Sequence, residues 1–270
     1  MKCLELFSGT GSVGKVMKQY DIETISVDIE PRFKPTILAD IMKWNYKEYP
    51  PNHFDIITAS PVCMYWSHLR YCWIGRACLG IRPNGEIITK EILQEDIDKY
   101  GKPMVDKMFE IIQYFQPKYY WIENPKTSSM WKYIKEKYEN LDLYYNRYDY
   151  CKYSNWGYQK PTIFATNFEV IPPMICKKDC ENIITIKTQK GDIHKGYKIP
   201  IKSKFRILHS NQLGNMKIQK NIRTALNKES GHTKKCKGTS REERYRIPPK
   251  LIEELLESIY LNIHIENELL

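Results

Sequence analysis

The sequence lacks any long hydrophobic run, and none of its 270 residues lies in a stretch of the roughly 18 apolar residues that a membrane-spanning helix requires. The apolar stretch at the N-terminus is too short for a signal peptide. Internal repeats and low-complexity tracts are also missing, which excludes solenoid and fibrous architectures. We therefore expect a soluble, intracellular protein, cytoplasmic or nuclear, that does not bind membranes.

The sequence also lacks a regular cysteine framework. Its 8 cysteines are scattered, several of them beside apolar residues, which favours a reducing compartment over a disulfide scaffold. A hydrophobic content of 42% and an aromatic content of 13% indicate a folded globule rather than a disordered chain. The length suffices for one full α/β core and a small additional region, but not for two large domains.

Positive charge is concentrated in one part of the chain. Residues 168–250 contain 20 Lys and Arg against 7 Asp and Glu, whereas the remainder contains 22 against 25. A nearly neutral body with one basic segment is typical of a protein that binds a polyanion. An ordinary solvated lysine-rich surface is the alternative, and we favour nucleic acid.

Short apolar segments alternate with helical patterns along most of the chain. A helical face is formed by Val105, Met108, Phe109, Ile112 and Phe115, and a second helix is expected within 248–263. This alternation predicts an α/β fold with a mostly parallel sheet and helices on both faces. Residues 64–101 show no sustained period and are expected to form an irregular functional or mobile segment. The expected strands are Lys2–Phe7, Thr24–Asp28, Ile37–Ile41, Asp55–Ser60, Tyr119–Glu123, Tyr144–Tyr150 and Thr162–Thr166.

A glycine-rich turn follows the first expected strand. Gly9, Gly11 and Gly14 form a G-x-G-x-x-G pattern, and Asp28 ends the next strand. Such a turn lets a ligand approach the backbone, and an acid at the second strand end accepts hydrogen bonds from ribose hydroxyls. The pattern alone is compatible with a nicotinamide enzyme. Asp40 further along can accept from an adenine amino group, although a turn or capping role explains it equally well.

A thiol and a carboxyl group follow two other strands. Cys63 lies just past the strand that ends at Ser60, and Glu123 ends the strand that begins at Tyr119. A thiolate adds to electron-poor carbon, and a carboxyl group in a dry pocket keeps its proton and can hydrogen-bond a heterocycle nitrogen. The alternatives are a buried, inert cysteine and a glutamate paired with a lysine. Because both lie at the carboxyl edge of the sheet, we favour a catalytic pair.

These segments resemble the motifs of the cytosine-5 DNA methyltransferases, in the same order. Leu6–Gly11 resembles the first motif, and Asp28 and Asp40 match the ribose- and adenine-binding acids. The nucleophile loop, the Glu-Asn-Val signature, the paired-arginine motif and the opening of the last motif correspond to Ser60–Cys63, Glu123–Pro125, Tyr158–Thr162 and Tyr245–Leu251. The variant spellings are most similar to short viral or phage-type members.

The resemblance implies a domain organisation and a set of partners. Residues 1–167 would form a Rossmann-like, S-adenosylmethionine-dependent catalytic domain, completed by a C-terminal helix in 245–270. Residues 168–244 would form a small, basic target-recognition region. The substrate would be DNA, in double-stranded form.

The resemblance also assigns roles to individual residues. Cys63 would attack C6 of a cytosine swung out of the duplex, while protonated Glu123 holds N3 and the exocyclic amine, and segment 64–101 would close over the base. Lys160 would supply positive charge near the thiolate in place of an arginine. S-adenosylmethionine would be bound by Phe7, Ser8, Gly9, Thr10, Gly11, Asp28, Ile29, Asp40 and Ile41.

The chain departs from the family pattern at four positions, and this keeps other functions open. They are Val62, Pro125, Lys160 and Thr162. Loss of the paired arginines is compatible with a catalytically impaired DNA-binding homologue. The Ser60–Val62 segment also echoes the loop of exocyclic-amine (N4-cytosine) methyltransferases, although those enzymes need no thiol. The small recognition region is compatible with an RNA cytosine-5 methyltransferase as well.

The basic region contains candidate metal ligands. Cys176 and Cys180 are separated by three residues, and His194 follows. Together they suggest a structural zinc ion, which can fold a small region that has no core of its own. Further candidates downstream are His209, His232 and Cys236.

Overall fold

The computed structural model describes residues 1–77, 84–187, 193–194, 197–198, 205–209, 216–217 and 243–268. The chain forms two compact units. The first comprises Met1–Tyr148, Pro161–Pro173 and Ile252–Leu270, and the second comprises Asp149–Lys160 and Met174–Leu251.

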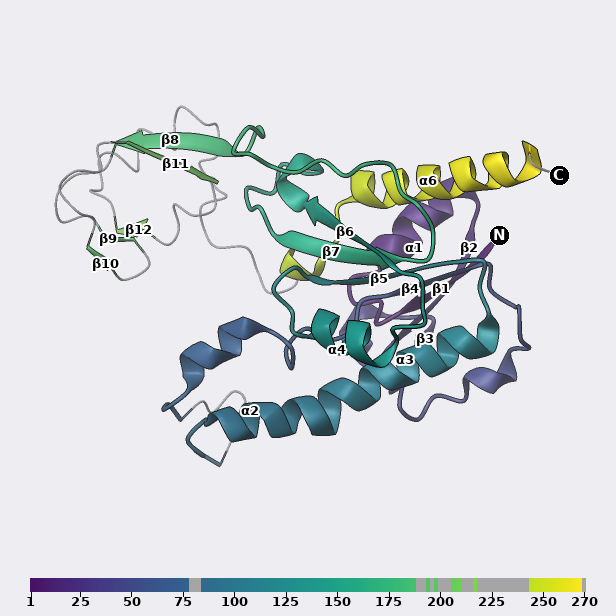
Figure 1. The fold of residues 1–270 in the computed structure, drawn as a ribbon, viewed down its shortest axis with the longest axis horizontal. Coiled ribbons are helices and arrows are strands. Elements are labelled where there is room, and N and C mark those ends of the chain that lie inside the picture. The colour runs from purple at the N-terminus through teal and green to yellow at the C-terminus, as the bar shows by residue number, and fades with distance from the viewer. Residues whose placement is uncertain are drawn as a thin grey trace. The chain divides into compact units, whose positions relative to one another are not determined.

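The first unit is built on a seven-stranded sheet with the order β3-β2-β1-β4-β5-β7-β6 (Figure 1). Neighbours from β3 to β5 pair in parallel, and β7 runs antiparallel to β5. All seven expected strands are present, although the third is shorter than expected. They are β1 (Lys2–Leu6), β2 (Glu23–Asp28), β3 (Ile37–Leu38), β4 (Ile56–Ala59), β5 (Tyr119–Pro125), β6 (Tyr144–Asp149) and β7 (Pro161–Thr166).

Helices cover both faces of this sheet, as the sequence predicts. Figure 1 shows α1 (Ser12–Met17) and α6 (Pro249–Glu268) on one face, and α3 (Lys102–Phe115) and α4 (Met130–Lys137) on the other. Helix α3 buries all five positions of its predicted apolar face. Helix α6 is tied to the segment after β7, because the Ser258 hydroxyl accepts a hydrogen bond from the Ile171 amide at 3.0 Å.

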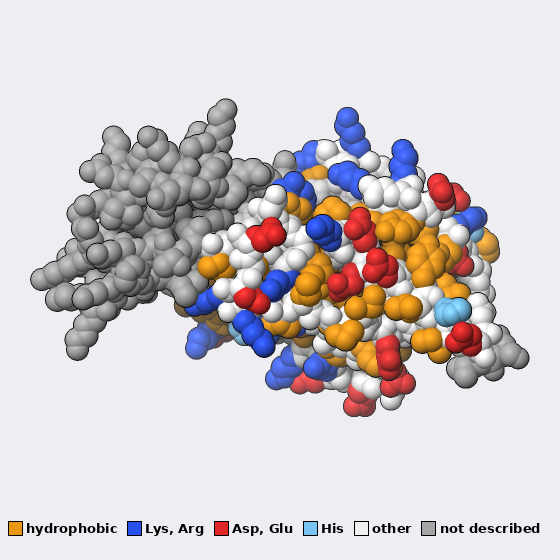
Figure 2. Space-filling view, turned by 90° about the horizontal axis from the view of Figure 1, so that it is seen from above, with side chains coloured by type: hydrophobic (Ala, Val, Ile, Leu, Met, Phe, Trp, Pro, Cys, Tyr) orange, Lys and Arg blue, Asp and Glu red, His pale blue; other side chains and the backbone are white. Residues whose placement is uncertain are grey.

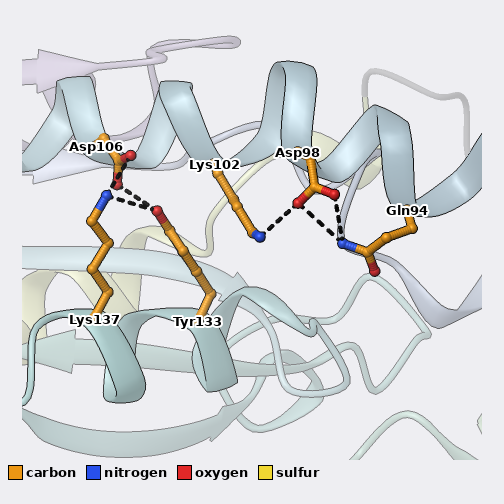
Figure 3. A network of polar contacts seen from close by, with 6 residues as sticks. All are labelled: Gln94, Asp98, Lys102, Asp106, Tyr133 and Lys137. Carbon is orange, nitrogen blue, oxygen red and sulfur yellow. Dashed lines mark hydrogen bonds and ion pairs between the residues drawn. The ribbon is translucent and has the colours of Figure 1, made fainter.

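A polar network joins α3 to α4 (Figure 3). The Asp106 carboxylate accepts hydrogen bonds from the hydroxyls of Tyr133 and Tyr138 and from the Lys137 ammonium, each at 2.7 Å. Burial alone would raise the pKa of Asp106, but these donors outweigh it and lower the pKa below its usual value. The pairing of a charged acceptor with three donors fixes where the two helices meet.

The prediction that 64–101 is irregular is wrong for the last part of this segment, which is helical. Helix α2 (Lys90–Asp96) begins there, capped by the Thr89 hydroxyl, which accepts from the Ile92 amide. It continues through a π-helical turn, Ile97–Gly101, into α3. Its buried residues are Leu93 and Asp96, and Asp96 forms a buried ion pair with Arg70. Because a charged residue occupies a buried position, the apolar period that identifies a helix is hidden.

The second unit contains short strands in its described part. Strands β8 (Ile183–Lys187) and β11 (Phe205–His209) pair antiparallel, and β9 (Ile193–His194) pairs with β10 (Tyr197–Lys198) and β12 (Met216–Lys217). The other short helical turns of the described residues are Lys18–Tyr20, Pro31–Phe33, Tyr46–Glu48, His68–Trp73, Tyr150–Lys152 and Glu243–Tyr245.

The helices of the described ranges are too short or too polar to cross a bilayer. Figure 2 views the described residues from the side of α6, where acidic and basic side chains lie among exposed apolar ones. Tyr260, Leu261 and Ile265 of α6 are exposed.

Candidate active site

The turn between β1 and α1 has the backbone conformation that its glycines allow. Phe7, Gly9 and Gly11 have positive φ values of 56°, 48° and 63°. The Gly9 amide donates to Asp28 Oδ2 at 2.7 Å, which ties this turn to the end of β2. The turn therefore lies at the carboxyl edge of the sheet, where ligands of open α/β folds bind.

Glu5 binds the first turn of the helix that follows the glycine-rich turn, a role that the sequence did not reveal. Its carboxylate accepts from the amides of Val13 and Gly14, at 3.2 and 3.0 Å, in the first turn of α1. A Cβ atom on Gly14 would lie 3.1 Å from Glu5 Oε2, so the third glycine of the motif serves this close contact. Burial raises the pKa of Glu5 to about 7, although the two amides oppose that effect.

Asp28 accepts two backbone hydrogen bonds at the end of β2, and its role as a ribose-binding acid stays a prediction. Oδ2 accepts from Gly9, and Oδ1 accepts from the Glu30 amide at 2.8 Å. A carboxylate offers about four acceptor positions, so about two remain for ligand hydroxyls. Ile29, the next residue, is 65% exposed, so its apolar side chain is accessible to a ligand that contacts Asp28.

Asp40 forms a local turn. Its Oδ1 accepts from the Met42 amide at 3.0 Å, and its carbonyl accepts from the amides of Lys43 and Trp44. The turn role that the sequence left open is therefore present. Ile41 beside it is buried. Contact of Asp40 with an adenine amino group stays a prediction, since one carboxylate can serve both partners.

The segment that carries Cys63 leaves the sheet beside Glu123 of β5. Strand β4 pairs with β5 so that Ala59 lies opposite Ile122, and the chain after Ala59 therefore emerges beside Glu123. The fully buried Asn124 side chain donates to the Pro61 carbonyl at 2.8 Å. Cys63 lies two residues beyond Pro61, at most about 7 Å of extended chain. Glu123 is 8% exposed, and Cys63 is partly exposed.

Trp66 anchors the loop after Cys63 and is a residue that the sequence analysis missed. Its amide donates to the Cys63 carbonyl at 3.1 Å, and its own carbonyl accepts from the Ser129 hydroxyl at 3.1 Å. The indole ring stacks on Tyr133, with ring centroids 5.6 Å apart. A Cβ atom on Gly101 would lie 3.0 Å from the same ring, so this packing requires glycine.

Lys160 and Thr162, the two positions that replace the family's paired arginines, belong to different units. Thr162 is fully buried in β7 and pairs with Pro125 of β5, so two of the four departures face each other in the ladder. Lys160 belongs to the second unit, with φ of 38° and its Nζ 4.5 Å from the centroid of the Tyr150 ring. A catalytic role for Lys160 stays a prediction.

The second unit brings together four potential metal ligands. The sulfur atoms of Cys151, Cys176 and Cys180 and a ring nitrogen of His209 all lie within 4.8 Å of one another. Cys176, Cys180 and His209 are among the candidates that the sequence indicates, whereas Cys151 has no nearby ligand in the sequence that would have indicated it. The expected ligand His194 belongs to β9, but its side chain lies outside the part that the structure describes. The candidates His232 and Cys236 lie outside the described residues altogether.

Comparisons with known proteins place these features in context. No protein-family model matches the chain. A probable DNA (cytosine-5)-methyltransferase from Frog virus 3 (isolate Goorha) is 33% identical over 263 residues, which cover 95% of this chain and 99% of the viral protein. The similarity thus extends over nearly the whole length of both chains.

Two solved methyltransferase structures are also similar, at low identity. The Entamoeba histolytica methyltransferase EhMeth has a TM-score of 0.49 and 13% identity, over 97% of this chain and 98% of that one. The S. pombe Dnmt2 methyltransferase has a TM-score of 0.40 and 15% identity, over 64% of this chain and 52% of that one. This chain therefore matches about half the length of the S. pombe protein.

Proposed function

This chain belongs to the DNA (cytosine-5)-methyltransferase family, and from that premise we propose that it transfers a methyl group from S-adenosylmethionine to C5 of cytosine in DNA. The observation that carries the proposal is the pairing of β4 with β5, which brings the segments of Cys63 and Glu123 out of the sheet together. The hydrogen bond from Asn124 to Pro61 then holds the two segments in contact.

The residues at the glycine-rich turn fit S-adenosylmethionine. We propose that Phe7–Gly11 contact the methionine part of the cofactor. Asp28 would accept hydrogen bonds from the ribose hydroxyls, and the exposed Ile29 would pack on the adenine ring. Asp40 and Ile41 would line the other edge of the adenine. The cofactor supplies an electron-poor methyl group on a sulfonium, and the chain's part is to orient that group toward the base.

Cys63 and Glu123 divide the chemistry of the base between them. The Cys63 thiolate forms a bond to C6, and the displaced electron pair makes C5 nucleophilic toward the methyl group. Protonated Glu123 donates to N3 and accepts from the exocyclic amine, so that charge developing on the ring is neutralised. C5 then loses its proton, the C6–S bond breaks, and the electron pair restores the aromatic ring. Glu123 is 8% exposed, so a base that contacts it is largely shielded from water.

Two further assignments rest on sequence position. Lys160 directly precedes β7, the neighbour of β5, and we propose that it supplies positive charge near the thiolate, although an ammonium cannot form the two-pronged contact of an arginine. We propose that residues 168–244 form the target-recognition region and bind double-stranded DNA, with residues 1–167 and 245–270 as the catalytic domain. Phosphate contacts by Lys and Arg would make that binding steeply dependent on salt.

A mechanism-based trap tests the proposal. Duplex DNA that contains 5-fluorocytosine has no C5 proton to lose, so the enzyme should remain covalently attached once the methyl group is transferred. We expect a denaturant-stable adduct that requires S-adenosylmethionine, is absent from Cys63→Ala, and persists in Cys72→Ala, a matched change at an exposed cysteine.

The outcomes of the trap distinguish the alternatives. A wild-type protein that binds S-adenosylmethionine and DNA but yields no adduct would favour a DNA-binding homologue without turnover. Adducts on RNA alone would move the substrate class from DNA to RNA. Recovery of N4-methylcytosine from unmodified DNA would show that the exocyclic amine is the acceptor.

A further inference from the structure

We propose that Cys151, Cys176, Cys180 and His209 bind a single structural zinc ion in the second unit. The proposal is independent of the methyl-transfer chemistry, because none of these residues belongs to the proposed catalytic pair. Three thiols and one imidazole form one of the common ligand sets of structural zinc, and four protein ligands leave no open position for catalysis.

The spacing of the ligand atoms suits a tetrahedral ion. With Zn–S near 2.3 Å and Zn–N near 2.0 Å, the sulfur–nitrogen separation in a tetrahedron is about 3.5 Å and the sulfur–sulfur separation about 3.8 Å. His209 Nε2 lies 3.6 Å from Cys176 Sγ, and all four ligand atoms lie within 4.8 Å of one another. Metal binding therefore requires movements of about 1 Å at most, within the reach of side-chain rotation.

The loop between Cys176 and Cys180 is shaped to present sulfur acceptors. The Lys178 amide donates to Cys176 Sγ at 3.3 Å, and Lys178 has a positive φ of 66° that turns this amide inward. Amide donors stabilise a thiolate, which is the form that binds metal. The Cys176 amide in turn donates to Asp149 Oδ2 at 2.9 Å, so the fully buried Asp149 holds the start of the loop.

Three of the four ligands are buried at the end of the β8–β11 ladder, and Cys180 is partly exposed. Cys151, Cys176 and His209 are 4%, 7% and 5% exposed, and His209 is the last residue of β11, opposite Ile183 of β8. An ion here would join the turn at 150–152, the loop at 176–180 and the end of β11. Among the described residues the second unit has only strands of two to five residues, for which a metal can replace a larger core.

An ion pair joins two of the segments that carry the ligands. Lys152 lies next to ligand Cys151, its side chain is 18% exposed, and its Nζ is 2.9 Å from Asp179 in the ligand loop. This pair holds the turn that carries Cys151 against the loop that carries Cys176 and Cys180, which keeps their thiols close together.

Metal analysis of the full-length protein tests the proposal. We expect about one zinc per chain in protein expressed with zinc and purified without chelator. Cys176→Ser and His209→Ala should each weaken zinc binding by at least about 10–100-fold, the range for losing even an outer-shell partner. Cys72→Ser and His264→Ala, at exposed positions, serve as matched controls and should retain the metal.

Cobalt substitution keeps the test independent of variants that fail to fold. Wild-type protein loaded with Co²⁺ should show the visible bands of a tetrahedral ion and thiolate-to-cobalt charge transfer. Wild-type protein with substoichiometric zinc and no such bands would overturn the proposal. So would zinc that persists in His209→Ala but is lost in His194→Ala, since that result would place the ligand on β9.

Discussion

The two units of the chain are stabilised in different ways. The first has a large apolar core in which residues from every layer, such as Leu4, Ile57, Phe109 and Leu255, are fully buried. The described part of the second has short strands around three thiols and an imidazole. From this difference we expect the first unit to be stable by itself and the second to depend on its proposed zinc ligands.

Metal removal should give the largest effect and should separate the two units. Structural zinc contributes on the order of 10 kcal/mol in small zinc-folded peptides, so a strong chelator should unfold the second unit. We expect DNA binding to be lost while S-adenosylmethionine binding, measured by calorimetry, is retained. If the second unit still resists limited proteolysis after complete zinc removal, it does not depend on zinc for its fold.

Replacing the proposed acid should affect catalysis alone. Glu123→Gln removes the ionisable group while keeping a similar shape, and we expect kcat to fall by about 10²–10⁴-fold. The KM for S-adenosylmethionine should stay nearly constant, because the proposed cofactor residues lie at or after the ends of β1, β2 and β3, whereas Glu123 lies on β5. Glu110→Gln, at an acid on the surface of α3, is the matched control. A loss of less than about tenfold would remove Glu123 from the proton chemistry.

Truncating the loop anchor should affect stability and catalysis together. Trp66→Ala leaves a cavity between Tyr133 and Gly101, and we expect the free energy of unfolding to fall by about 3–5 kcal/mol. The loop that carries Cys63 would lose its fixed position, so kcat should fall as well. Trp66→Phe keeps an apolar ring and should recover most of both quantities. Full activity in Trp66→Ala would show that the loop is positioned by other contacts.

The buried acid under the glycine-rich turn should make the stability of the first unit depend on pH. Because folding raises the pKa of Glu5 from 4.5 to about 7, the folded state binds more protons between these values. The stability contributed by Glu5 is complete below about pH 4.5 and is lost as the pH rises through 7.

A pair of urea titrations measures this effect. The unfolding free energy of the wild type minus that of Glu5→Gln should fall by on the order of 2 kcal/mol from pH 5 to pH 8, because only the wild type loses stability over this range. Glu48→Gln, at an exposed acid, should show no such trend. A difference that stays constant with pH would mean that Glu5 is charged throughout.

The sequence predicts the sheet and the order of its motifs well because both are local signals. Apolar strands, the glycine-rich turn and acids at strand ends can each be recognised from a few neighbouring residues. Helix α2 was missed since Asp96 takes a buried position through its pair with Arg70, which lies 26 residues away. A charge at an interior position looks like a surface residue until its partner is known.

By itself, therefore, the sequence determined the α/β fold, the family and the identity of the candidate nucleophile and acid. Only the tertiary structure decided that Glu5 supports the glycine-rich turn, that Trp66 fixes the loop after Cys63, and that Cys151 and His209 join Cys176 and Cys180. These contacts connect side chains far apart in the chain, and such distances leave no periodic pattern along it.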